Sequence, residues 1–177
     1  MKAVWWILTV ALTLASVVVV AFGVRQLDAG PTLAAPAGPS APAATPPPVA
    51  DSAQRRDEVL EFGREAAVRL LSYTPQSAQR ELAEAADELT TGAFRDEYTE
   101  LITTVILPAA TRKQVTSEAQ VPAIAVESLD RSRASLLVFV NQRVTIGTQE
   151  PTNPTSSMRM RLEKVGESWL VANFDPL

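Results

Sequence analysis

The chain has 177 residues, a formal net charge of −4, and neither cysteine nor histidine. Without histidine it lacks the usual general base, the Ser-His and Cys-His nucleophile pairs and the commonest zinc ligands. Without cysteine it has no disulfides, so the fold depends on its core alone. The sequence pI near 4.9 argues against a nucleic-acid partner. We therefore assign no catalytic, metal-binding or cofactor-binding residue.

The N-terminal stretch 3–24 contains no charged residue and is bracketed by Lys2 and Arg25. As a helix it would span roughly 33 Å, close to the thickness of a bilayer's hydrocarbon core. It is longer than the apolar part of a cleavable signal peptide, which is about 7–15 residues. Residues 1–27 are therefore predicted to be a transmembrane anchor that attaches the protein to the lipid bilayer.

The few positive charges around this segment slightly favour a cytoplasmic N-terminus. We therefore predict a single-pass protein of the cell membrane, with its soluble part on the extracytoplasmic side. Residues 28–51 are rich in Ala and Pro and hold seven of the thirteen prolines. Such a segment buries too little apolar surface to fold, which predicts a disordered tether. A proline-rich ligand is the alternative, although its spacing at 36–42 has no basic residue nearby.

Residues 52–177 are predicted to form one domain, and three segments in its first half have apolar residues at helical spacing. They predict helices over about 52–72, 75–89 and 94–108. The third helix ends near Pro108 or continues past a kink. The apolar residues of the first helix are Val59, Phe62, Ala66, Ala67 and Leu70.

Two helix boundaries have local signals. Pro75 disfavours helical geometry at Thr74 and can begin the second helix. Gly92 is predicted to follow the end of that helix as its C′ residue. The outer side of the second helix is acidic, which is typical of a solvated face and much less often of a cation site. Its acidic residues are Glu81, Glu84, Asp87 and Glu88.

The second half of the domain has the residue pattern of β-strands. We predict them over 115–129, 135–146, 157–165 and 168–174, with turns or loops between them. Pro122 suggests an edge strand or a bulge. The second strand is apolar and β-branched at its centre and is expected to be the most buried.

Helices followed by a strand meander predict an α+β domain, with about three helices on one face of a curved antiparallel sheet of about four strands. In the third strand Met158, Met160 and Leu162 alternate with charged residues. Arg159 and Arg161 would then face away from the helices. This face is either a docking surface for a partner or a solvated sheet face.

The order of these features resembles the Mce-associated membrane proteins of actinobacteria, which accompany Mce-type lipid importers. The resemblance is carried by Tyr73-Thr74, by residues 89–98 (LTTGAFRDEY) and by residues 169–171 (WLV), and it covers about residues 55–174. It implies a cone-shaped fold similar to nuclear transport factor 2 (NTF2) and to the periplasmic domains of VirB8-like proteins. It also implies a non-catalytic role in the assembly or stability of an Mce complex, with Mce transporter subunits as partners.

Two other functions stay open. One is a VirB8-like scaffold of a secretion or conjugation system. The other is an enzyme or small-ligand-binding domain that uses the interior of the cone, for which Tyr73, Tyr98 and Glu127 are the candidate residues. Trp169 is interpreted as an aromatic core anchor, because an indole buries a large apolar area.

Overall fold

The computed structural model describes residues 49–177. The predicted anchor at 1–27 and nearly all of the predicted tether lie outside the described residues. Within the described part, none of the helices combines the length and apolarity that a membrane span requires.

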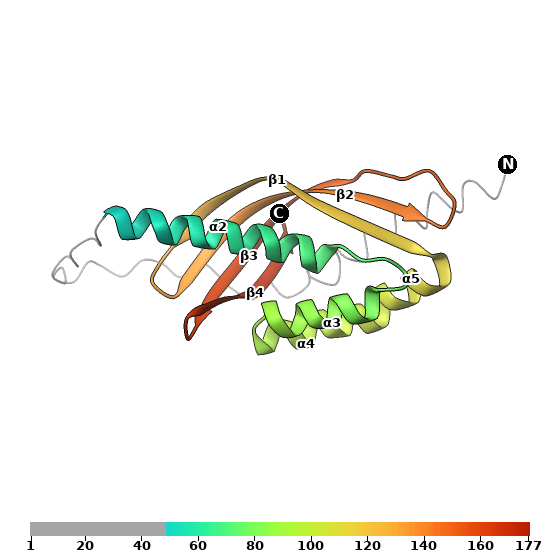
Figure 1. The fold of residues 1–177 in the computed structure, drawn as a ribbon, viewed down its shortest axis with the longest axis horizontal. Helices are drawn as coiled ribbons and strands as arrows, with labels where there is room; N and C mark the ends of the chain where they lie inside the picture. Colours follow the sequence, from blue (N-terminus) through green and yellow to red (C-terminus); the bar gives the residue numbers. More distant parts are fainter. Residues whose placement is uncertain (1–48) are drawn as a thin grey trace, which may run out of the picture. The chain divides into compact units, whose positions relative to one another are not determined.

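Three helical segments precede four strands (Figure 1). The third helical segment is continuous, with a π-helical section η1 between α4 and α5. The elements are α2 (Val49–Leu71), α3 (Ala78–Leu89), α4 (Gly92–Leu101), η1 (Ile102–Ile106), α5 (Leu107–Lys113), β1 (Val115–Leu129), β2 (Arg133–Ile146), β3 (Thr155–Val165) and β4 (Ser168–Pro176).

The strands form one antiparallel sheet in the order β1-β2-β3-β4, and the helices lie along one face of it (Figure 1). Side chains on successive residues of a strand point to opposite faces, so one set is buried under the helices. The predicted α+β architecture is confirmed. The buried set on β2 to β4 comprises Ala134, Leu136, Val138, Val140, Met158, Met160, Leu162, Trp169, Val171 and Phe174.

Helix α2 crosses the sheet at very short range, and Gly63 makes this possible. A Cβ atom on Gly63 would lie 2.4 Å from Cδ1 of Leu136 and 3.2 Å from Cδ1 of Ile124. Such a separation is below van der Waals contact, so only glycine fits without a shift of the Leu136 side chain.

Strand β2, which was predicted to be the most buried, is buried on one of its faces only. Leu136 and Val138 are buried, but Phe139 between Val138 and Val140 is 46% exposed. The helices cover only one face of an antiparallel sheet, so a strand that is apolar on both faces still leaves alternate residues in solvent.

Bulges adjust which residues of the two edge strands point inward. The register between β1 and β2 shifts between Gln120 and Ala123, around Pro122, as predicted. A second shift, opposite Arg161 and Leu162, lies in β4. It brings Phe174 to the buried face although the alternation of Trp169 and Val171 would place it outside.

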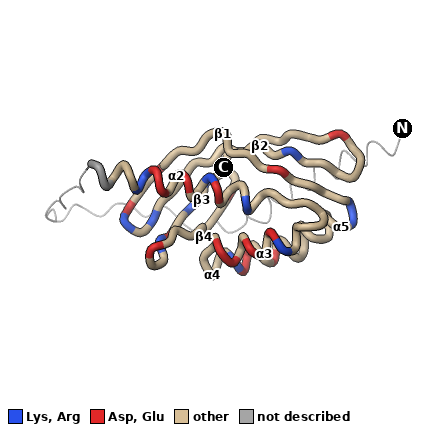
Figure 2. The backbone as a smooth tube through the Cα atoms, viewed as in Figure 1, with Lys and Arg blue, Asp and Glu red and all other residues tan. Residues whose placement is uncertain are grey.

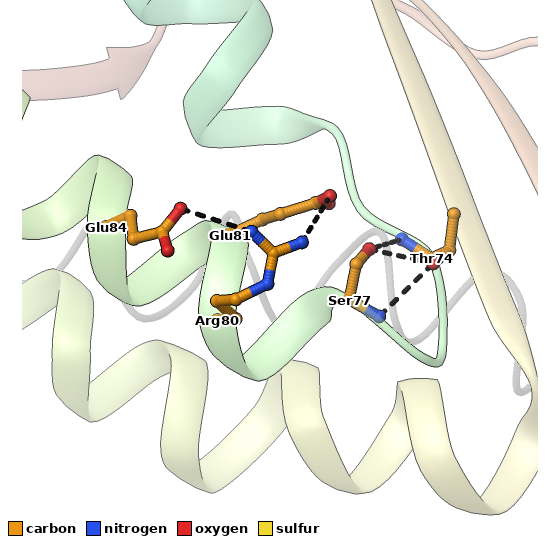
Figure 3. Close-up of polar contacts among 5 residues, drawn as sticks. All are labelled: Thr74, Ser77, Arg80, Glu81 and Glu84. Carbon is orange, nitrogen blue, oxygen red and sulfur yellow. Dashed lines mark hydrogen bonds and ion pairs between the residues drawn. The ribbon is translucent and has the colours of Figure 1, made fainter.

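Helix α3 begins at Ala78, three residues after the predicted start at Pro75. Ahead of it, Thr74 and Ser77 form a reciprocal pair of hydrogen bonds (Figure 3). The Thr74 amide donates to Ser77 Oγ at 3.2 Å, and the Ser77 amide donates to Thr74 Oγ1 at 3.2 Å. The intervening residues form a turn before the first helical residue.

Gly92 begins helix α4, which corrects the prediction that it ends α3. Helix α3 ends at Leu89, and Thr90 is extended rather than left-handed. Thr90 instead pairs with Val171 of β4, and the amide of Thr91 donates to the Val171 carbonyl at 2.9 Å. A strand-like contact therefore ends α3, and no left-handed C′ residue is needed.

The third helix continues past Pro108 to Lys113, the second of the two predicted outcomes. The irregularity lies before the proline, in the π section, where the Leu107 amide donates to the Ile102 carbonyl five residues earlier. Proline has no amide hydrogen and its ring crowds the preceding turn, so a wider turn there relieves the helix.

Candidate functional site

Tyr98 caps the C-terminal end of helix α2. Its side chain is 5% exposed, and its hydroxyl donates to the Leu70 carbonyl at 2.6 Å. Burial, together with the neighbouring Tyr73, raises the pKa of Tyr98 well above its ordinary range. The carbonyls of a helix's last turn lack intrahelical partners, so this hydroxyl fills a structural need. Its aromatic ring also stacks on Phe94, with 6.0 Å between the ring centroids.

Tyr73 contacts the sheet through its backbone. Its amide donates to the Ser117 carbonyl at 2.8 Å, and its carbonyl accepts from the Ser117 amide at 2.9 Å. The hydroxyl of Ser117 in turn donates to the Leu71 carbonyl at 2.8 Å. Burial raises the pKa of Tyr73. Tyr73 and Ser117 therefore join the end of α2 to the open edge of β1.

Glu127 lies on the opposite face of the sheet, away from both tyrosines. Its carboxylate accepts from Nε and Nη2 of Arg159, both at 3.0 Å, and from Ser135 Oγ at 2.7 Å. The hydrogen bond from Ser135, followed by that from Arg159, lowers the pKa of Glu127. The three residues that the sequence suggested for a pocket are thus not brought together.

The outer face of the sheet, which points away from the helices, carries the large exposed apolar side chains of the described residues. Phe139, Val165 and Leu177 are 46%, 56% and 62% exposed. Phe139 and Val165 occupy outward positions of β2 and β3, and the Leu177 amide donates to the Ser157 carbonyl at 2.9 Å beside Phe139. Sequence reasoning missed Phe139, because an apolar strand does not reveal which face is covered.

Charge is distributed differently over the two layers (Figure 2). Acidic residues gather along α3, whereas residues of both signs are scattered over the strands. The acidic residues of α3 are paired with nearby arginines, for example Glu88 with Arg69 at 2.6 Å and Asp87 with Arg95 at 3.6 Å. This agrees with a solvated helix face. The described residues contain no group of three or more side chains suited to a metal ion.

Trp169 is 3% exposed, which confirms its interpretation as a core anchor. The Lys164 ammonium lies 5.7 Å from the centre of its ring. The polar groups described above join helices to each other, helices to strands, or strands to each other. The outer sheet face is therefore the best candidate for a binding surface. It is the face that carries Arg159 and Arg161, for which a docking surface was one of the two interpretations of the sequence.

No family model matches the chain. It is 39% identical over 129 residues to the Outer membrane protein Rv1973 of Mycobacterium tuberculosis, a match that covers 73% of this chain and 80% of the relative. It is also 33% identical over 111 residues to the Uncharacterized protein Rv1362c of the same organism, covering 62% of this chain and 50% of that relative.

Solved structures share the fold at low sequence identity. An IcmL-like type IV secretion system protein from Legionella pneumophila has a TM-score of 0.59 at 9% identity, covering 69% of this chain and 91% of that one. The periplasmic domain of DotI has a TM-score of 0.55 at 18% identity, covering 68% and 94%. The VirB8 protein of Agrobacterium tumefaciens has a TM-score of 0.50 at 14% identity, covering 75% and 96%.

The described domain thus has the VirB8-like, NTF2-like fold that was predicted, with three helices on a four-stranded antiparallel sheet. At these identities the likeness concerns the fold alone. The match to the mycobacterial relative is much stronger and covers most of both chains. The chain therefore belongs to the same family as the Outer membrane protein Rv1973 of Mycobacterium tuberculosis.

Proposed function

We propose that this chain is a non-enzymatic, single-pass membrane accessory protein that supports the assembly or stability of an Mce-type lipid import complex. The relationship to the Outer membrane protein Rv1973 of Mycobacterium tuberculosis carries this proposal, because the name of that relative places it in the cell envelope. The segments 89–98 and 169–171, on which the resemblance to Mce-associated proteins depends, lie within the described domain.

The polar side chains make structural hydrogen bonds, and this supports a non-catalytic role. Tyr98 caps α2, Glu127 is held by Ser135 and Arg159, and Tyr73 contributes backbone bonds to β1. Groups with such structural partners are poorly placed for acid–base work on a substrate. An exposed sheet face with apolar and charged side chains is instead suited to contact with another protein.

The test is affinity purification of the full chain from native membranes, after crosslinking and detergent extraction. We expect Mce permease or substrate-binding subunits to be recovered with it. The matched control is residues 1–51 alone, which keep the predicted anchor and tether and should recover no such subunit if the domain makes the contact. Recovery of no Mce subunit by the full chain would contradict the proposal.

A VirB8-like scaffold of a secretion or conjugation machine is the second candidate, and the fold favours it. One of the structures cited above is an IcmL-like type IV secretion system protein, and another is VirB8 of Agrobacterium tumefaciens. The same purification separates the two candidates, because a scaffold would recover secretion subunits instead. The side chains packed between α2 and the sheet, such as Leu136 and Met160, weigh against a small-ligand site there.

We propose the cell membrane as the location, with the domain on the extracytoplasmic side. The predicted anchor at residues 1–27 supports this, and the relative's name points to the envelope without deciding which membrane applies here. Fractionation of the cell envelope, followed by protease treatment of intact and opened cells, tests both statements. Domain that is digested only in opened cells would contradict the proposed side.

A further inference from the structure

The outer sheet face carries a row of small and apolar side chains that crosses β1, β2 and β3 and ends at the residue after β4. In the register, Ala123 of β1 stands opposite Phe139 of β2, and Phe139 stands opposite Ser157 of β3. Leu177 completes the row, because its amide donates to the Ser157 carbonyl at 2.9 Å. Ala125 and Leu137 form the next row toward the β1–β2 turn. The row that runs from Ala123 through Phe139 and Ser157 to Leu177 is hereafter called the Phe139 row.

The Phe139 row combines one large side chain with small ones on either side. Phe139 is 46% exposed, while its cross-strand neighbours Ala123 and Ser157 leave room beside the ring. In a two-fold interface the same patch must fit itself, so each copy has to supply both a projecting group and a space for it. A phenyl ring flanked by alanine and serine meets that requirement.

The charges around the row also suit self-association. Glu127 and Arg159 form a bidentate pair next to Leu137, and Asp175 stands opposite Arg159 in the register. Arg161 occupies the next outward position of β3, so the face carries two acidic and two basic groups near its centre. Because these charges balance, two copies of such a face do not repel each other.

The face is large enough for a weak but specific dimer. The nine paired residues of β2 and β3, at about 3.3 Å each, and four strands about 4.8 Å apart give a flat area on the order of 600 Å² before side chains add relief. A standard interface buries about 800 Å² on each partner. A membrane anchor would further favour contact by confining the copies to one plane.

We propose that the outer sheet face binds the same face of a second copy of this chain, with the Phe139 row at the two-fold axis. The proposal does not rest on the transport role, because it concerns contact between identical chains. It also leaves the edges of the sheet and the helical layer available for other partners.

Single-cysteine crosslinking of the full chain in native membranes tests this directly, since the chain has no cysteine of its own. Ser157→Cys places a thiol beside Phe139. Ala83→Cys, on the exposed side of α3, is the matched control. With a short bismaleimide we expect Ser157→Cys to give a band of twice the chain's mass, at least five times stronger than that from Ala83→Cys.

A second substitution in the Ser157→Cys chain asks whether Phe139 makes the contact. Phe139→Ser should weaken the double-mass band at least fivefold, while Phe139→Leu, which keeps an apolar projection, should largely preserve it. Thermal unfolding of each variant checks that the domain remains folded, as expected for an exposed position.

Four results would overturn the proposal. They are no double-mass band from Ser157→Cys, equal bands from Ser157→Cys and Ala83→Cys, a band that persists in the folded Phe139→Ser variant, and a Ser157→Cys crosslink found only to a different protein. The third would show that the Phe139 side chain does not make the contact. The fourth would assign the face to another partner.

Discussion

At the scale of single residues, Gly63 is the position where side-chain size matters most. Its missing Cβ lets α2 approach Leu136, and any larger residue forces one of the two to move. Gly63→Ala should lower the free energy of unfolding by about 1–3 kcal/mol, although alanine favours the helix. Chemical denaturation of the wild type and the variant measures this difference.

Gly92 provides the control for Gly63. It lies at the first residue of α4, and no atom is within 4 Å of the Cβ that alanine would add. Gly92→Ala should therefore leave stability unchanged or raise it by up to about 1 kcal/mol. Equal destabilisation by both substitutions would show that crowding against Leu136 is not the cause.

The lowered pKa of Glu127 predicts that the stability of the domain depends slightly on pH. Ser135 and Arg159 hold the pKa of Glu127 below its ordinary value of 4.5, so the ionised carboxylate favours the folded chain. This contribution is present above pH 4.5 and is lost as the pH falls through the lower, folded-state pKa. The wild type should therefore unfold at a higher temperature than Glu127→Gln at pH 7, and the difference should shrink in acid. A difference that is constant down to pH 3 would contradict this account.

At the scale of elements, the end of α2 is held by two hydroxyl groups from other elements. Tyr98 of α4 donates to the Leu70 carbonyl, and Ser117 of β1 donates to the Leu71 carbonyl. Tyr98→Phe keeps the ring and removes the donor, which leaves the buried Leu70 carbonyl without this partner. We expect a loss of about 1–3 kcal/mol in the free energy of unfolding, measured by denaturant titration.

Tyr73→Phe is the matched comparison at the same junction. Tyr73 holds Ser117 with its backbone, which the substitution does not alter. Tyr73→Phe should therefore change the free energy of unfolding by no more than about 0.5 kcal/mol. A larger loss for Tyr73→Phe than for Tyr98→Phe would refute the idea that the Tyr98 hydroxyl secures α2.

At the scale of the whole domain, the two faces of the sheet should respond differently to substitution. Met160 is fully buried on the inner face, and Phe139 is 46% exposed on the outer one. Met160→Ala should lower the free energy of unfolding by about 2–5 kcal/mol. Phe139→Ser should change it by less than about 1 kcal/mol while reducing association. Denaturation of the two variants in dilute detergent separates these effects.

The fold was largely predictable because its patterns are local. The alternation of Met158, Met160 and Leu162 and the helical spacing of Val59 and Leu70 identify their elements directly. The start of α3 and the role of Gly92 were not predictable. The turn formed by residues 75–77 and the pairing of Thr90 with β4 set these boundaries, and neither follows from the spacing of apolar residues.

The sequence by itself determined the α+β class, the order of the elements, the missing cysteine and histidine chemistry and the inward face of β3, because each follows from composition or from the period of apolar residues. Only the tertiary structure decided that Tyr73, Tyr98 and Glu127 form no common site and that Phe139 faces solvent. The physical reason is that covering one face of a sheet is a long-range event. Both faces of β2 are apolar in sequence, and the position of the helices alone separates the core from the surface.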